Sequence, residues 1–274
     1  SLHDALPILL LLIVVLAAVI MIPRKVTSGL GQDNGGLAGS AAFGKNMDNP
    51  GPNPSPEPKT QKTHVTVPKS VKAVYISSWV AGTPSLRNKI VDMIDKTEIN
   101  AVVLDIKDYT GMVSFQPFTD SESGKAVLAE GCIENRIKDA ADFIKTLHDK
   151  NIYVIGRVAT FQDPCMVKKH PEWAVKTKST GAIWKDHKGI TWIDAGTPEA
   201  WNYNVQIARA SHDIGFDEIN FDYIRYPSDG NMEDIAFPIS GDRERSETLK
   251  VFFRYIDKEL RGGKAKGVEK YVAT

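Results

Sequence analysis

Gly-Phe-Asp-Glu-Ile-Asn-Phe-Asp-Tyr-Ile-Arg-Tyr-Pro-Ser-Asp-Gly, residues 215–230, is the stretch that decides the fold. At the two-residue period of a β-strand, its apolar and polar side chains fall on opposite faces. The apolar face has Ile219, Phe221 and Tyr223, and the polar face has Glu218, Asn220 and Asp222. The segment comes after a helical pattern and ends in a turn, which is typical of a parallel strand that opens into a functional loop. We predict that the polar face looks into the site of a parallel barrel, although a solvated edge strand would share the pattern.

Three further strands and the helices between them precede this segment. The predicted strands cover 71–78, 100–107 and 151–158, and the predicted helices cover 85–96, 133–149, 198–214 and 243–260. Residues 159–197 form a long excursion with a hairpin around 179–181, and 270–273 begin a fifth strand. The alternation of strand and helix predicts right-handed crossovers and a parallel sheet. An open doubly wound sheet is the alternative, but no glycine-rich phosphate turn comes after the first strand.

The predicted fold class is therefore α/β, a parallel (β/α)8 barrel of the TIM type. Eight strand–helix units take about 250 residues, whereas residues 70–274 hold about four and a half units. We expect this stretch to be the N-terminal portion of a barrel, cut before strands five to eight.

The first 69 residues have a different composition. Residues 8–22 are an unbroken apolar run closed by Pro23-Arg24-Lys25, so residues 1–25 are predicted to form a transmembrane signal anchor; a cleaved signal peptide is the alternative. The two basic residues would keep the chain after them in the cytoplasm, but the chain begins with Ser1, and we expect the true N-terminus to be missing. Residues 26–69 are rich in Pro, Gly, Asn and Ser and are predicted to be a disordered linker.

The overall composition excludes some classes of partner. The chain has 274 residues, formal net charge zero, 42% hydrophobic and 25% charged residues, which indicates one globular domain with appendages. A nucleic-acid partner is not expected, because no basic stripe interleaved with aromatic residues occurs. The histidines show no metal-ligand spacing, so we expect neither a metal nor another cofactor.

Ionisable side chains stand at the ends of three predicted strands. They are Asp105, Lys107 and Asp108 after the second strand, Arg157 after the third, and Asp222 and Arg225 after the fourth. Carboxylates and cations gathered at one rim set each other's protonation state, as a catalytic site requires. Taken singly, Asp105 or Asp108 could be an ordinary turn carboxylate and Arg157 a structural ion pair.

Aromatic residues crowd the same predicted loops. They are Trp79, Phe161, Trp173, Trp184, Trp192 and Tyr226. Flat apolar rings beside carboxylates suit sugar rings, which stack through their C–H faces and hydrogen-bond through their hydroxyls. Core packing is the alternative for any single tryptophan, but four of the five fall in predicted loops.

Two cysteines, Cys132 and Cys165, fall in loops on the carboxyl side of neighbouring strands. In an exported protein we predict a disulfide between them, which closes a loop of about 34 residues and contributes about 3 to 4 kcal/mol. Two unpaired thiols are the alternative.

Segments 71–84, 98–111 and 215–230 together resemble a bacterial family of glycoside hydrolases, long classified only as a domain of unknown function. Trp-Ile-Asp-Ala-Gly at 192–196 is similar to a further family segment, with Ala195 where proline is usual. The resemblance covers about 71–274. It implies a (β/α)8 barrel related to polysaccharide-degrading enzymes and attached outside the cell by an N-terminal anchor.

The resemblance also implies roles for individual residues. Asp222 would be the principal catalytic carboxylate, and Asp105, Lys107, Arg157 and Asp194 would line the sugar site. The acid/base partner would come from a later strand. Together with the patterns above, the expected site has Asp222 and Asp105 as catalytic residues. The expected substrate-binding residues are Lys107, Asp108, Arg157, Asp194, Glu218, Asn220, Arg225, Tyr226, Trp79 and Trp184.

The expected function is carboxylate-based hydrolysis of a glycosidic bond in an extracellular or cell-wall polysaccharide. The expected partners are this polysaccharide and, through the N-terminal helix, a lipid bilayer. A surface-displayed barrel that binds carbohydrate without cutting it is the main alternative. A metal-assisted lyase or phosphodiesterase using Asp105, Asp108 and Asp222 is a third.

Overall fold

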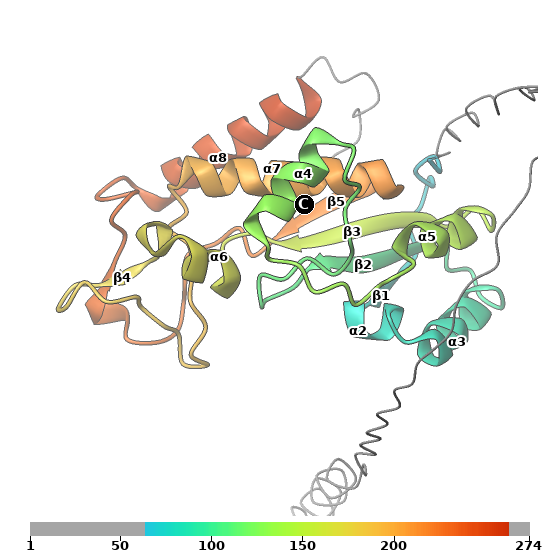
Figure 1. Ribbon diagram of the computed structural model, residues 1–274, viewed down its shortest axis with the longest axis horizontal. Helices are drawn as coiled ribbons and strands as arrows, with labels where there is room; N and C mark the ends of the chain where they lie inside the picture. Colours follow the sequence, from blue (N-terminus) through green and yellow to red (C-terminus); the bar gives the residue numbers. More distant parts are fainter. Residues whose placement is uncertain (1–63, 263–274) are drawn as a thin grey trace, which may run out of the picture. The chain divides into compact units, whose positions relative to one another are not determined.

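The computed structural model describes residues 64–262 and contains a four-stranded parallel sheet in the order β1-β2-β3-β5 (Figure 1). Its strands are β1 (Ala73–Ile76), β2 (Ala101–Lys107), β3 (Tyr153–Ala159) and β5 (Glu218–Asp222). All four predicted strands and their parallel pairing are confirmed. In the described part of the chain the sheet is open, so closure into a barrel stays a prediction.

Several predictions concern segments outside the described residues. They are the anchor at 1–25, the linker as far as residue 63 and the fifth strand at 270–273. Between residues 64 and 262, no helix is both long and apolar enough to cross a membrane.

Seven α-helices occur in the described residues. They are α2 (Ser78–Ala81), α3 (Pro84–Ile94), α4 (Glu122–Glu130), α5 (Ala140–His148), α6 (Pro164–Lys169), α7 (Pro198–Ile214) and α8 (Arg245–Arg261). Helix α7 begins at its proline and ends before Gly215, as predicted, because proline fits the first turn and glycine accepts a positive φ, here 122°.

The prediction of one helix over 133–149 is wrong at its start. The backbone of residues 133–137 pairs with residues 113–114 instead, through Glu134 N to the Val113 carbonyl and Ile137 N to the Ser114 carbonyl. The helix α5 therefore begins only at Ala140. Helix α4 was missed, although Ser121 caps its first turn and Gly131 ends it with a φ of 68°.

The long excursion after β3 folds against the loop after β5. It contains α6, a 3-10 turn at Pro171–Trp173 and β4 (Lys176–Thr177). The predicted hairpin is present, with Thr177 N donating to the Ala182 carbonyl. Strand β4 pairs antiparallel with β6 (Ile235–Ala236), which comes after a 3-10 turn at Met232–Asp234. This small ribbon, at the left of Figure 1, fixes the excursion beside the end of β5.

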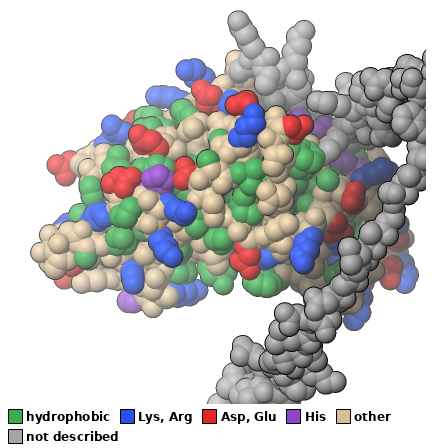
Figure 2. Space-filling view, in the orientation of Figure 1, with side chains coloured by type: hydrophobic (Ala, Val, Ile, Leu, Met, Phe, Trp, Pro, Cys, Tyr) green, Lys and Arg blue, Asp and Glu red, His purple; other side chains and the backbone are tan. Residues whose placement is uncertain are grey.

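The two faces of the parallel sheet differ in chemistry. One face contributes the main hydrophobic core, and its strand residues include Ile76, Val102, Leu104, Val154, Val158, Ile219 and Phe221. The other face has a small apolar cluster of Ala101, Tyr153 and Ile155, which Val65 and Val103 contact. Toward the carboxyl ends of the strands this second face, called here the polar face, bears Tyr75, Asp105, Arg157, Asn220 and Asp222. Around the sheet, acidic and basic side chains are interspersed on the surface in view (Figure 2).

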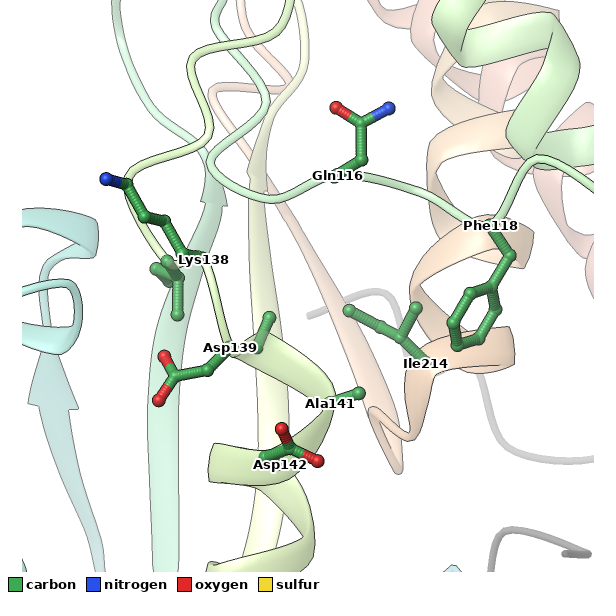
Figure 3. Close-up of a pocket in the computed structure, with 9 residues that line it drawn as sticks. Gln116, Phe118, Lys138, Asp139, Ala141, Asp142 and Ile214 are labelled. Carbon is green, nitrogen blue, oxygen red and sulfur yellow. The ribbon is translucent and has the colours of Figure 1, made fainter. Parts of the chain in front are cut away.

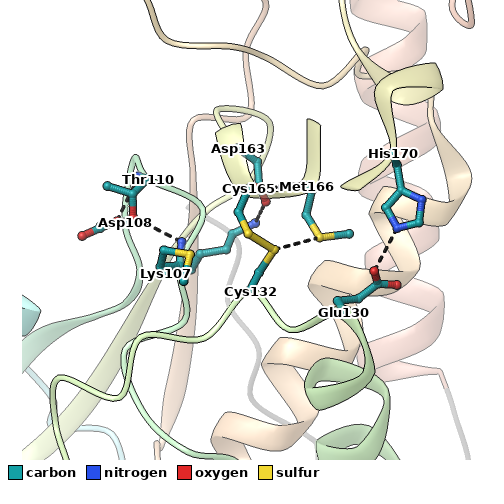
Figure 4. The surroundings of a disulfide bond; sticks show 10 residues. Lys107, Asp108, Thr110, Glu130, Cys132, Asp163, Cys165, Met166 and His170 are labelled. Atoms are coloured by element: carbon teal, nitrogen blue, oxygen red, sulfur yellow. Dashed lines mark hydrogen bonds and ion pairs between the residues drawn. A yellow bond between two sulfur atoms is a disulfide. The ribbon is translucent and has the colours of Figure 1, made fainter. Parts of the chain in front are cut away.

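A disulfide joins Cys132, just beyond α4, to Cys165 in α6 (Figure 4). The two Cα atoms are 5.9 Å apart, and Cys132 is fully buried against Met166. The structure thus contains the predicted pairing and not two free thiols. The bond ties the loop after β2 to the loop after β3.

Reducing this disulfide is expected to lower the free energy of unfolding by about 3 to 4 kcal/mol, because the open chain regains the entropy of a long loop. Urea unfolding with and without reductant measures the loss. A Cys132→Ala/Cys165→Ala protein should be indifferent to reductant. An unchanged midpoint in reductant, together with alkylation of both cysteines in the native protein, would contradict the pairing.

Asp217, which precedes β5, secures the amino-terminal end of the sheet. Its carboxylate accepts hydrogen bonds from the backbone N–H groups of Val65 and Val154, both at 2.8 Å, and contacts His148 Nε2 at 2.9 Å. Burial raises the pKa of Asp217, but the hydrogen bonds from His148, His64 and Val154 outweigh it, so the pKa lies below its ordinary value. The ionised carboxylate therefore stabilises the folded state.

Asp217→Asn is expected to cost about 1 to 3 kcal/mol at pH 7, the range for a buried group that loses charged hydrogen bonds. Because the folded pKa is depressed, the contribution is present above the unfolded value of about 3.9 and is lost as the pH falls through the folded pKa. Urea unfolding of both proteins at a series of pH values down to 2 measures it. A difference that persists unchanged at the lowest pH would contradict this origin.

Candidate active site

Asp222 ends β5 on the polar face, and 44% of its side chain is exposed. Arg157 donates to Asp222 Oδ2 through Nε at 2.8 Å, with Nη2 at 2.7 Å, and the backbone N–H of Tyr223 donates to Oδ1 at 2.6 Å. Tyr223 has a φ of 54°, so the strand alternation stops at Asp222. Tyr223 lies beyond the end of the strand but still packs against the main hydrophobic core.

Asp105 lies beside Arg157 because the register of β2 and β3 pairs the two residues. Arg157 Nη1 donates to Asp105 Oδ1 at 2.9 Å, and the Tyr75 hydroxyl donates to Oδ2 at 2.5 Å. Only 5% of the Asp105 side chain is exposed. Burial, and after it the hydrogen bond to Asp105, raises the pKa of Tyr75, so its hydroxyl remains a neutral donor.

The guanidinium of Arg157 is thus shared between two carboxylates. It also lies 5.8 Å from the ring centre of Tyr75 and 5.6 Å from that of Tyr223. Burial lowers the pKa of Arg157, but the hydrogen bonds to Asp105 and Asp222 raise it further, and the net direction is upward. Arg157 therefore stays charged and places one positive charge between the two carboxyl groups.

The two carboxylates differ in what they can do. Both oxygens of Asp105 are engaged and its side chain is buried, so it can hold Arg157 in place but has no free oxygen for a substrate. Asp222 is paired with the same arginine, and its other side is open to solvent. It can therefore attack or stabilise an electron-poor carbon.

Glu218 lies on the same face as Asp222 but far along the strand. Four residues at about 3.3 Å each place it about 13 Å away. The Tyr153 hydroxyl donates to Glu218 Oε2 at 2.9 Å, and burial raises the pKa of Glu218. At this separation it cannot act on the same bond as Asp222. Asn220, between them, is paired in register with Arg157.

Arg225 extends the site beyond the end of β5. Its guanidinium lies 4.9 Å from the ring centre of Trp192 and 5.5 Å from that of Tyr223, and Nη1 donates to Ser228 Oγ at 2.9 Å. Tyr223 is thus flanked by both Arg157 and Arg225. The structure brings together Asp222, Asp105, Arg157 and Arg225, as the sequence predicted.

Lys107 does not join this group. Its side chain has no exposed surface, and Nζ donates to Asp163 Oδ2 at 2.7 Å and to Asn204 Oδ1 at 3.0 Å (Figure 4). Strict alternation would place Lys107 on the face of Asp105, but the register shifts between the two residues and pairs Lys107 with Val158 of the core face. Such an irregularity moves the next side chain to the other side of a sheet. The predicted substrate contact of Lys107 is therefore not available.

Asp194 is also buried, and its hydrogen bonds hold a loop of the excursion in place. Its carboxylate accepts hydrogen bonds from the backbone N–H groups of Gly196, Ile239 and Ser240 at 2.9, 2.8 and 3.0 Å. These contacts join the excursion to the segment before α8. Asp194 has no exposed surface with which to line a sugar site, contrary to the expectation from the resemblance.

Four other predicted residues make their contacts with residues other than Asp222. Asp108 accepts from Arg136 Nη1 at 2.6 Å, and Arg136 in turn lies 4.5 Å from the ring of Trp79, which is 61% exposed. Asp108 also accepts from the backbone N–H of Thr110 at 2.9 Å, so it is the turn carboxylate that the sequence left open as an alternative. Trp184 is buried, and its Nε1 donates to the Asn231 carbonyl at 2.9 Å. It therefore holds the excursion against the loop after β5, and its ring is not exposed to a ligand. Tyr226 is buried against Phe237.

Sequence reasoning missed Tyr75, Tyr223 and Arg136. Tyr75 could have been found from the sequence. At the two-residue period of β1, its side chain points to the same side of the sheet as the polar face. The contacts of Tyr223 with the two arginines were missed because its left-handed backbone has no signal in the sequence. Arg136 lies in a loop without periodicity.

Two other features of the described residues were considered as alternative functional sites, a metal site and the hollow in Figure 3. Among residues 64–262, no group of three or more His, Cys, Asp or Glu side chains is placed to hold a metal ion. The hollow of Figure 3 lies between the loop after β2 and the start of α5, and its lining includes Gln116, Phe118, Lys138 and Asp142. Asp139 beside it is already paired with Arg87.

The described residues thus form a parallel α/β domain with an exposed, arginine-paired carboxylate at the end of a strand. Residues 73–268 match the family described as "Putative glycosyl hydrolase domain". The crystal structure of a hypothetical protein from Ruminiclostridium thermocellum is 34% identical, covering 73% of this chain and 96% of that chain with a TM-score of 0.62. The chain belongs to this glycosyl hydrolase domain family.

Known glycosidases are more distant. The α-L-fucosidase isoenzyme 2 of Paenibacillus thiaminolyticus is 12% identical over 74% of this chain and 32% of that chain, with a TM-score of 0.49. An α-galactosidase from Thermus thermophilus is 13% identical over 73% and 38%, with a TM-score of 0.44. This chain spans less than two fifths of either enzyme, and we assign no residue role from them. No curated protein sequence matches the chain significantly.

Proposed function

We propose that the protein hydrolyses a glycosidic bond in an extracellular or cell-wall polysaccharide, with Asp222 as the principal catalytic carboxylate. The observation that supports this most is the exposure of Asp222 while two N–H groups of Arg157 hold its other side in place. Membership of the glycosyl hydrolase domain family gives the class of reaction. In this reaction an ionised carboxylate attacks the anomeric carbon or stabilises the oxocarbenium-like centre that forms there.

Asp105 and Tyr75 act as positioning residues in this proposal. They fix one end of the Arg157 guanidinium, so that its other end presents two N–H groups to Asp222. The acid that protonates the leaving oxygen must lie within about 5 to 9.5 Å of Asp222. Glu218 is too far and Asp105 is already engaged. We therefore propose that the acid comes from outside residues 64–262.

The location is also proposed. We expect the domain to be held on the outer side of a membrane by the apolar run at 8–22. The disulfide between Cys132 and Cys165 supports export, since such bonds persist in oxidising compartments.

The full-length protein, incubated with a panel of extracellular and cell-wall polysaccharides, is expected to release new reducing ends from at least one of them. Retention of each polysaccharide on immobilised protein is measured alongside. Retention without release on every member of the panel would favour the alternative, a carbohydrate-binding barrel without catalysis. Activity that disappears with a chelator and returns with a divalent cation would favour the metal-assisted alternative.

A further inference from the structure

A hollow of about 400 Å³ opens beside the site, between the loop after β5, the β4–β6 ribbon and the start of α8. In Figure 1 the elements that line it are near the label of β4. Its lining combines two aromatic rings with several charged side chains. Those used below are Tyr226, Phe237, Lys178, Arg243, Arg245 and Asp242.

The positive charge of this hollow is neutralised only in part, through Asp242 and through the attraction between Lys178 and Asp234. Three of its side chains are cationic and one, Asp242, is a carboxylate. Within residues 64–262 neither Arg243 nor Arg245 forms an ion pair, and Lys178 Nζ reaches only the Glu233 carbonyl at 3.4 Å.

Neighbouring acids are engaged elsewhere. Glu244 accepts from Glu247 N and caps α8, and Asp234 accepts from Ser179. Other arginines of the domain do have carboxylate partners, as in Arg87–Asp139 and Arg209–Glu259. The hollow is therefore a cationic site that the fold leaves open to an anion.

The aromatic floor orients one of these cations. Tyr226 and Phe237 contact edge to face, with ring centres 4.9 Å apart. The Arg245 guanidinium lies 5.2 Å from the Tyr226 ring and 5.3 Å from the Phe237 ring. Such contacts hold the planar group in place while its N–H donors stay free to bind a carboxylate at two points. The Tyr226 hydroxyl is buried and has no hydrogen-bond partner in the described residues, so packing alone does not explain a phenol here.

The hollow is close enough to Asp222 to bind the same ligand. Tyr226 comes four residues after Asp222, which limits the separation of their Cα atoms to about 14 Å. Arg225 lies between them and stacks on Tyr223, which in turn contacts Arg157. A bound polymer could thus extend from the polar face of the sheet into the hollow.

We infer that this hollow binds a carboxylate-bearing sugar unit, so that the substrate is an acidic polysaccharide. Arg245 receives the carboxylate, with Arg243 and Lys178 adding positive charge, and the aromatic floor contacts the sugar ring. The inference rests on the proposed function for the carbohydrate nature of the ligand. It goes further than that proposal by stating that the substrate is anionic, which does not follow from Asp222 itself.

Binding can be measured apart from cleavage in the full-length Asp222→Asn protein, by affinity electrophoresis through gels of polygalacturonate, alginate and hyaluronan. Each polymer is compared with its carboxyl-reduced form. At least one acidic polymer is expected to bind at least about tenfold more tightly than its reduced form. Arg245→Gln should lose about tenfold in affinity for that acidic polymer and little for the reduced one, since the lost interaction is a charge-assisted hydrogen bond. Arg245→Lys keeps the positive charge but loses the two-pronged donor group. Its affinity for the acidic polymer should lie between those of the Arg245 and Arg245→Gln proteins.

Arg254→Gln is the matched control, because it removes the same charge from an exposed position of the same helix, nine residues further on. It should leave binding unchanged. Equal binding of acidic and reduced polymers, binding to none of them, or equal losses in Arg245→Gln and Arg254→Gln would overturn the inference. Charge-selective binding in a protein that cuts no polysaccharide would retain the inference and remove the proposed hydrolysis.

Discussion

Asp222→Asn in the full-length protein is expected to reduce the release of reducing sugar by at least about 1000-fold, a loss of roughly 4 kcal/mol in transition-state stabilisation. The amide has nearly the shape of the carboxylate but carries no charge. It can neither attack the anomeric carbon nor stabilise positive charge there. Because the Asp222 side chain is 44% exposed, the substitution should leave the fold intact, which circular dichroism checks.

Asp213→Asn is the control for this change. Asp213 is exposed on α7, where the same loss of charge occurs away from the polar face. Its activity should equal that of the unmodified protein. Hydrolysis by Asp222→Asn at the rate of the Asp213→Asn protein would remove Asp222 from the mechanism.

Lys107→Met is expected to lower the free energy of unfolding by about 3 to 5 kcal/mol, the largest change in stability that we predict. Lys107 and Asp163 are both fully buried, and Nζ lies 2.7 Å from Oδ2. Methionine fills much of the space but leaves the Asp163 charge buried without its partner. Urea unfolding measures the difference.

Two companion variants separate this mechanism from a packing defect. Lys107→Met/Asp163→Asn removes both charges and should recover part of the stability, because asparagine can still cap α6 as Asp163 does. Lys150→Met breaks the exposed pair with Asp95 and should cost less than about 1 kcal/mol. A similar small loss for Lys107→Met would show that the buried pair is not needed for stability.

The strands and the central site residues were predictable because they obey the two-residue period. Apolar residues alternate with Glu218, Asn220 and Asp222 in β5, and parallel register then sets Asp105 beside Arg157. The carboxyl ends of neighbouring parallel strands meet at one edge, so residues far apart in the sequence come together there. This reasoning needs no knowledge of loops, and it is where the prediction succeeded.

The predictions that failed concern residues outside the regular two-residue period of the strands. A register irregularity after Asp105 moved Lys107 into the core, and a left-handed Tyr223 left the strand pattern. Trp184 and Asp194 belong to the excursion after β3, whose packing against the loop after β5 depends on many long-range contacts. In such a segment, residue type alone does not distinguish a side chain that binds sugar from one that holds the loop together.

The central claim, that Asp222 faces a carbohydrate cleft, can be tested most directly by labelling carboxyl groups with a water-soluble carbodiimide and an amine and mapping the sites by peptide mass spectrometry. We expect Asp222 to be labelled in the free protein and protected when oligosaccharides of the cleaved polysaccharide are present, while exposed Asp213 is labelled in both conditions. Equal labelling of Asp222 with and without a saturating oligosaccharide would contradict the account.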